Sequence, residues 1–199
     1  MRMIGGPSIF DSFLNLSYNN SDGEVGIVYY GEIKKVDIAN GIGVRVSLFV
    51  SGCTHHCKGC FNRETWGFNY GRPFTEETEE EIFRLLEPPY ISGLTLLGGE
   101  PMEYENQRAL APFVKKVKER FPEKTIWCYT GYLFEDILNR MLPAWKCTQD
   151  ILNCLDVLVD GPFVAEEKEL GLRFRGSKNQ RIIDVKKSLT EGKIKLWED

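Results

Sequence analysis

From residue 25 onward the chain alternates between short apolar runs and amphipathic segments. Continuous apolar runs are typical of buried strands, and they occur at residues 44–50, 93–99, 125–131, 155–161 and 181–185. Apolar positions three or four residues apart indicate helices, and this spacing occurs within residues 74–89, 110–117 and 134–141. The alternation predicts an α/β fold with mostly parallel strands and flanking helices.

The remaining patterns concern the ends of these elements. Thr75 stands before an acidic first turn, so it predicts the start of the helix within residues 74–89. Two β-rich runs within residues 25–38 predict a hairpin that turns about Gly31. Residues 1–24 are rich in Asn, Ser and Gly and lack periodicity, which predicts a flexible N-terminal extension followed by a single domain over residues 25–199.

Composition and charge narrow the class of protein. The net charge of -4 comes from 25 basic and 29 acidic residues, so the chain carries no general signature of nucleic-acid binding. No apolar run is long enough to span a bilayer, and Gly5, Gly6 and Pro7 interrupt any signal-peptide segment. We therefore expect a cytoplasmic protein with no membrane partner, in which a cluster of reduced cysteines indicates a metal site.

Half of the six cysteines lie in one loop directly after the strand predicted at residues 44–50, namely Cys53, Cys57 and Cys60. Thiolates are soft ligands that select iron–sulfur clusters, zinc or Cu(I). A cubane cluster has four irons, so three cysteines leave one iron open for another molecule. The alternative is a zinc site completed by His55 or His56, the two histidines of the chain.

Other chemically distinctive residues lie at or directly after the carboxyl ends of the predicted strands. They are Gly98, Gly99 and Glu100 at one strand end, Thr130 and Gly131 at the next, and Asp160 and Gly161 at the third. The carboxyl ends of parallel strands lie at one edge of a sheet, where binding sites are built. The sequence therefore predicts that these residues and the cysteines form one site.

The cysteine motif and four later motifs together carry a family resemblance. CTHHCKGC resembles the signature of the radical S-adenosylmethionine (SAM) enzymes. The segment VDIANGIGVRVSLFVSGCTHHCKGCFNRETW, followed by LLGGEP, WCYTGY, VLVDGPF and RFRGSKNQRIIDV, is similar to the activating proteins of anaerobic ribonucleoside-triphosphate reductase. The similarity covers about residues 33–186, with the motifs in the family's order.

The resemblance implies a fold and a reaction. The fold is an incomplete (β/α) barrel of the radical SAM type, shorter than a full barrel of about 250 residues. The three cysteines would bind a 4Fe-4S cluster, and SAM would chelate the open iron. Reductive cleavage of SAM would give a 5′-deoxyadenosyl radical, which takes a hydrogen atom from a glycine of the reductase's large subunit and leaves a glycyl radical there. A one-electron donor such as flavodoxin would reduce the cluster.

The resemblance also assigns residues of this chain to SAM binding: Gly59, Cys60, Phe61, Gly98, Gly99, Glu100, Thr130, Asp160 and Arg175. Gly59 and Phe61 would face the adenine. Residues 98–100 would bind the methionine ammonium through exposed backbone and a carboxylate, and the family often has Asp where this chain has Glu100. The two strand-end residues would lie near the sugar and the methionine carboxylate, with Arg175 as the positive partner of that carboxylate. Asn62 and Trp66 are expected to shape the loop or the partner surface.

Three alternatives stay open. One is activation of another glycyl-radical enzyme such as pyruvate formate-lyase, whose activators tend to be longer. Another is a small radical SAM enzyme that modifies a purine-like metabolite. The third is a zinc-binding module without catalysis. The remaining cysteines lack a pattern and are expected to have no function beyond packing, namely Cys128, Cys147 and Cys154.

Overall fold

The computed structural model describes residues 27–198, so the extension predicted at residues 1–24 lies outside the described residues. In chain order the elements are β1 (Tyr29–Asp37), β2 (Val44–Val50), a 3₁₀ helix (Arg63–Trp66), β3 (Arg72–Pro73), α1 (Glu76–Leu86), β4 (Ile91–Gly98), α2 (Tyr104–Arg120), β5 (Thr125–Tyr129), α3 (Phe134–Asp136), a π-helix (Ile137–Met141), α4 (Lys146–Cys154), β6 (Val157–Asp160), another 3₁₀ helix (Ala165–Glu167), β7 (Arg181–Asp184) and α5 (Val185–Glu191).

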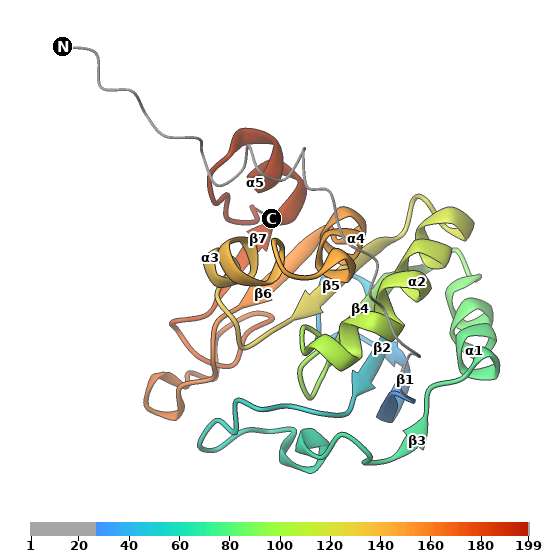
Figure 1. The fold of residues 1–199 in the computed structure, drawn as a ribbon, viewed down its shortest axis with the longest axis horizontal. Helices are drawn as coiled ribbons and strands as arrows, with labels where there is room; N and C mark the ends of the chain where they lie inside the picture. The colour runs from blue at the N-terminus through green and yellow to red at the C-terminus, as the bar shows by residue number, and fades with distance from the viewer. Residues whose placement is uncertain (1–26, 199) are drawn as a thin grey trace.

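The strands form one seven-stranded sheet in the order β3-β1-β2-β4-β5-β6-β7 (Figure 1). The central strands β2, β4, β5 and β6 are parallel to one another. At the two sides, β1 pairs antiparallel with β2 and β3, and β7 pairs antiparallel with β6. The α/β class is confirmed, but the sheet is mixed rather than mostly parallel. The incomplete barrel stays a prediction.

The predicted hairpin about Gly31 is wrong, because β1 continues through this residue. The hairpin instead joins β1 to β2 through residues 38–43. Gly31 lies at a register shift, where Tyr30 and Glu32 face the consecutive residues Val50 and Phe49 of β2. One extra residue on one strand makes a β-bulge. A glycine between two β-rich runs is typical of both a bulge and a turn, so the pattern did not distinguish them.

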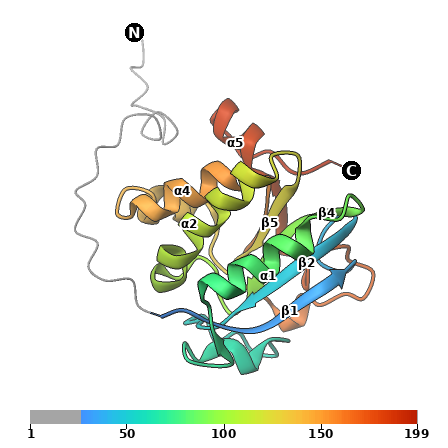
Figure 2. The same ribbon diagram turned by 90° about the vertical axis from the view of Figure 1, so that its right-hand side faces the viewer.

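Side chains of the central strands alternate between two faces of the sheet. On the face we call the helical face, strand residues such as Val46, Leu96 and Cys128 join the main core with residues of α1, α2 and α4. Figure 2 shows these three helices gathered on that face. On the opposite face, the loop face, Trp127, Val157 and Val159 form a smaller cluster covered by the side chains of Phe174 and Trp197.

The helices predicted at residues 74–89 and 134–141 lie close to their predicted bounds, whereas α2 extends beyond the predicted residues 110–117 at both ends. The helix α1 begins after Thr75, whose N–H donates to Thr78 Oγ1 at 3.3 Å. The segment 134–141 is helical but changes from α to π geometry after Asp136. The helix α4 was not predicted, because Thr148 occupies one position of its buried stripe. Among the described residues, no helix has the length and apolarity needed to cross a membrane.

Candidate functional site

The four parallel strands end side by side, and the segments that follow them surround one cavity. In the sheet register Val50 pairs with Gly98, Leu96 with Cys128, and Tyr129 with Val159. The cavity has a volume of about 410 Å³, within the range of small-molecule sites. Its lining includes these residues predicted from the sequence: Cys53, Cys57, Cys60, Phe61, Gly98, Gly99, Glu100, Thr130 and Arg175.

The cysteine loop, residues 51–62, is tied to the 3₁₀ helix that follows it. The N–H of Gly52 donates to the Thr65 carbonyl at 2.8 Å, and the N–H of Cys53 donates to the Trp66 carbonyl at 3.0 Å. Cys53 is buried, whereas Cys57 and Cys60 are partly exposed toward the cavity. The loop therefore presents three cysteines from one short segment to one open cavity.

Three thiols beside one cavity are a donor set that fits an iron–sulfur cluster. Within residues 27–198, no three His, Cys, Asp or Glu side chains converge closely enough to hold one metal ion. A cubane cluster places each thiolate on a different iron, so its ligands surround a volume instead of meeting at a point. Burial, together with the Glu100 and Glu103 carboxylates, raises the pKa of the Cys53 thiol to about 11. Iron binding would therefore release a proton from Cys53.

The glycine pair after β4 allows the backbone of this strand to approach the cysteine loop. Gly98 has φ of 107°, in the region that favours glycine. A Cβ atom on Gly99 would lie 2.6 Å from the Gly52 carbonyl oxygen. The N–H of Glu100 donates to that same carbonyl at 2.8 Å. The pair thus serves the contact between β4 and the cysteine loop, and both glycines also line the cavity.

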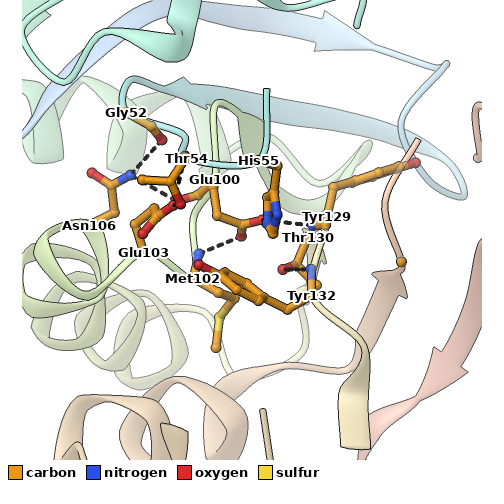
Figure 3. Close-up of polar contacts among 12 residues, drawn as sticks. Gly52, Thr54, His55, Glu100, Met102, Glu103, Asn106, Tyr129, Thr130 and Tyr132 are labelled. Atoms are coloured by element: carbon orange, nitrogen blue, oxygen red, sulfur yellow. Dashed lines mark hydrogen bonds and ion pairs between the residues drawn. The ribbon is translucent and has the colours of Figure 1, made fainter. Parts of the chain in front are cut away.

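The Glu100 carboxylate lies behind the cysteine loop and is only 1% exposed. Figure 3 shows it between His55 of that loop and the backbone that follows β5. His55 Nε2 lies 2.8 Å from Glu100 Oε2, which also accepts a hydrogen bond from the Gly131 N–H at 2.7 Å. The hydrogen bond to Glu100 raises the pKa of His55 above its ordinary value.

The structure places the other predicted residues unequally. Thr130 lines the cavity and its Oγ1 accepts a hydrogen bond from the Tyr132 N–H at 3.1 Å. Arg175 also lines the cavity, and its guanidinium donates to the Gln180 carbonyl at 2.9 Å. Asp160 is fully buried outside the lining, and it accepts hydrogen bonds from the Phe134 N–H and the Arg181 guanidinium. Its structural partners are clear, and its assignment to SAM binding stays a prediction.

A second loop, residues 161–180, faces the cysteine loop across the mouth of the cavity, and we call it the cover loop. The rings of Phe61 and Phe163 lie 5.4 Å apart, and Lys168 Nζ lies 4.6 Å from the centre of the Phe61 ring. Gly59 has no place in the lining, but a Cβ atom there would lie 3.5 Å from Ala165. Figure 1 shows the two loops close together beyond the ends of the central strands.

Sequence reasoning missed the polar residues that hold the cysteine loop. Thr54 was not singled out, and its N–H and hydroxyl both donate to Glu103 Oε1, at 2.9 and 2.5 Å. His55 was considered only as a possible zinc ligand. The position of Glu100 and Glu103 just after a predicted strand was an available signal. It places two carboxylates at the same edge of the sheet as the cysteine loop, where buried carboxylates need hydrogen-bond donors. Cys128 and Cys154 are buried in the main core, in agreement with a packing role.

Comparison with known proteins places the chain among a set of similar sequences. Residues 39–183 match the family model described as a 4Fe-4S single cluster domain. A protein of Pasteurella multocida is 43% identical over 155 residues, which is 77% of this chain and 95% of that protein. Proteins of Enterobacteria phage T4 and Vibrio cholerae are 44% and 41% identical, over 77% of this chain and 92% and 96% of their own lengths. All three are named anaerobic ribonucleoside-triphosphate reductase-activating protein.

Proposed function

The chain belongs to the family of anaerobic ribonucleoside-triphosphate reductase-activating proteins, and we propose that it activates such a reductase by generating a glycyl radical on its large subunit. One observation carries the proposal: the three thiols of the cysteine loop and the ends of β4 and β5 line the same cavity. We also propose that the mixed sheet is the incomplete barrel of the radical SAM type.

Different residues of the cavity would have different roles. Cys53, Cys57 and Cys60 would hold a 4Fe-4S cluster through three of its irons. When bound, this cluster supplies the electron that cleaves SAM to methionine and a 5′-deoxyadenosyl radical, which removes a hydrogen atom from a glycine of the reductase. The Arg175 guanidinium, which lines the cavity, is a cation available to the methionine carboxylate. The partly exposed backbone at residues 98–99 also lines the cavity and would lie against a bound SAM.

The partner would complete the enclosure. Phe61 is 68% exposed at the mouth of the cavity, which is high for an aromatic side chain. A segment of the reductase that covered this mouth would exclude water and suppress side reactions of the radical. SAM cleavage should therefore be slow with the activator alone and productive when the reductase is added. A one-electron donor of the flavodoxin type would reduce the cluster.

Electron paramagnetic resonance on an anaerobic mixture tests the proposal. The protein is reconstituted with iron and sulfide, reduced, and mixed with SAM and the large subunit of the reductase. We expect the doublet of a glycine-centred radical that depends on SAM and on the reductase. A parallel sample with pyruvate formate-lyase in place of the reductase should give no doublet. A reconstituted protein that binds SAM and gives no radical on the reductase would overturn the proposed function.

A further inference from the structure

Two carboxylates in the turn between β4 and α2 hold the segment between the first two cysteines. Glu103 Oε1 accepts two hydrogen bonds from Thr54, and Glu100 Oε2 lies 2.8 Å from His55 Nε2. Thr54 and His55 are the two residues that follow Cys53. Figure 3 shows both contacts side by side. The cysteine loop is therefore anchored at two consecutive residues within its ligand motif.

Most of the hydrogen-bonding capacity of the Glu100 carboxylate is used inside the chain. Oε1 accepts from the Met102 N–H at 2.8 Å, and Oε2 accepts from the Gly131 N–H at 2.7 Å and from His55. A carboxylate removed from water needs such donors, because burial without them is costly. The three donors come from the cysteine loop, the turn before α2 and the turn after β5. Glu100 thus joins three segments that surround the cavity.

His55 is fixed from two further sides. The Tyr132 ring packs edge-on against it, with 4.3 Å between the ring centres. A Cβ atom on Gly131 would lie 2.5 Å from the His55 ring, so only glycine fits at that position without displacing the ring. The neighbouring His56 differs, because its ring lies on Trp66 at 4.6 Å and its backbone has φ of 48°. The chain therefore contains two adjacent histidines of which one contacts Glu100.

We propose that Glu100 and His55 are positioning residues that fix the cysteine loop for cluster binding, with Glu103 and Thr54 as a second anchor. In this arrangement the Glu100 carboxylate acts on the loop through His55. The inference rests on the proposed function for the cluster that the cysteines hold. It gives the short segment between Cys53 and Cys57 a physical role, because that segment carries both anchoring side chains.

The test compares E100Q, H55N and H56N in the full chain, with thermal unfolding as the check on folding. Asn tolerates the positive φ of residue 56, so H56N is the matched control for H55N. Before reconstitution, amide hydrogen exchange in peptides covering residues 52–57 should be about tenfold faster in H55N and E100Q, since each loses a hydrogen bond to a buried charged group. After reconstitution, iron should be lost to a chelator about tenfold faster in the same two variants. H56N should behave like the unaltered chain.

The two roles of Glu100 predict different results for E100Q. If its carboxylate served only to bind SAM, E100Q would keep normal loop exchange and iron retention and would lose the change that SAM causes in the cluster's paramagnetic spectrum. That result, or equal behaviour of H55N and H56N, would overturn the inference. If E100Q fails to fold, T54V replaces it, because it removes one hydroxyl donor to Glu103 and should accelerate loop exchange by a smaller factor; unchanged exchange in T54V would also overturn the inference. Failure of the proposed function would appear separately, as a stable cluster that gives no glycyl radical.

Discussion

The helical face and the loop face of the sheet are built from alternate residues of the same strands, yet they bury different kinds of side chain. From β2, Val46 and Leu48 point into the main core under the helices. Arg45, on the loop face, is 1% exposed and donates five hydrogen bonds to hydroxyl and carbonyl oxygens. The strand side chains on the helical face are mostly apolar, although the helices above them bury a few hydrogen-bonded polar groups such as Gln107 and Thr148. The loop face needs polar partners.

The loop face is also covered more thinly. Phe174 and Trp197 reach Trp127 with ring centres 5.5 and 5.9 Å apart, and they come from irregular segments. The Tyr129 hydroxyl, beside the cavity, is buried without a hydrogen-bond partner among the described residues. Buried polar groups are usually paired, so such a group next to a cavity is available to a ligand. The comparison shows that alternate residues of one strand can serve an apolar core on one face and a polar network beside a cavity on the other.

The largest expected effect separates a cavity cysteine from a core cysteine. Cys57→Ala should abolish iron binding and the glycyl radical, because one ligand of the cluster is lost, and should change stability little because Cys57 is partly exposed. Cys128→Ala, on the helical face, should retain iron and cost about 1–2 kcal/mol of unfolding free energy. Iron analysis, the radical signal and denaturant unfolding measure these outcomes. Retention of a full radical signal in Cys57→Ala would contradict the assignment of the ligands.

A truncation in the main core should have the opposite effect to Cys57→Ala, with a large loss of stability and no loss of iron binding. Phe113 is fully buried on α2, with its ring 5.2 Å from that of Phe74 and 5.8 Å from that of Phe83. Phe113→Ala should cost about 3–5 kcal/mol because it leaves a cavity. Below its lowered melting temperature the variant should bind iron normally after reconstitution. Loss of iron binding in a folded Phe113→Ala protein would show that the two faces are coupled.

The sequence could predict the strands and their ends because the physical signal was local. Buried strands need continuous apolar runs, and the motifs that follow them meet wherever those strands are parallel. The cysteines, residues 98–100 and Thr130 were found in this way, and they do line one cavity. The strand directions of β1 and β7 could not be predicted, because side-chain patterns do not specify which neighbour a strand pairs with or in which direction.

The contacts of His55 and Asp160 could not be predicted from the sequence either. The contact between His55 and Glu100 spans 45 residues, and no local pattern encodes a hydrogen bond of that separation. Asp160 follows the same rule as the other strand-end residues, but its carboxylate turns toward the Phe134 N–H and Arg181 instead of the cavity. The position of a residue at a strand end is thus predictable, whereas the direction of its side chain depends on distant partners.

A smaller effect is expected on the loop face away from the cavity. Arg45→Met keeps most of the side-chain volume but leaves the Leu94 and Thr125 carbonyls without their donor. The cost should be about 2 kcal/mol, from the loss of partners for buried acceptors. Arg84→Met, on the exposed side of α1, is the control and should change stability by less than about 0.5 kcal/mol. Urea unfolding of both variants measures the difference in unfolding free energy. Equal stability of the two would show that the polar network of the loop face is dispensable.

The smallest effect concerns Asp156, in the turn before β6 at the opposite end of the strand from Asp160. Burial opposes ionisation of its carboxyl, but hydrogen bonds from Lys118, Lys186 and the Ile126 N–H outweigh burial and lower its pKa. A lowered pKa in the folded state contributes stability that is present above the ordinary pKa of about 3.9 and is lost as the pH falls through the lower folded value. Asp156→Asn should therefore cost about 1 kcal/mol near neutral pH, and the difference from the unaltered chain should shrink below about pH 4. Unfolding free energies measured between neutral pH and pH 3 test this, and a difference that stayed constant with pH would contradict it.

Asp156→Asn should leave iron retention unchanged, because Asp156 lies at the far end of its strand from the cavity. This result would distinguish a charge that stabilises the sheet from the carboxylates that hold the cysteine loop.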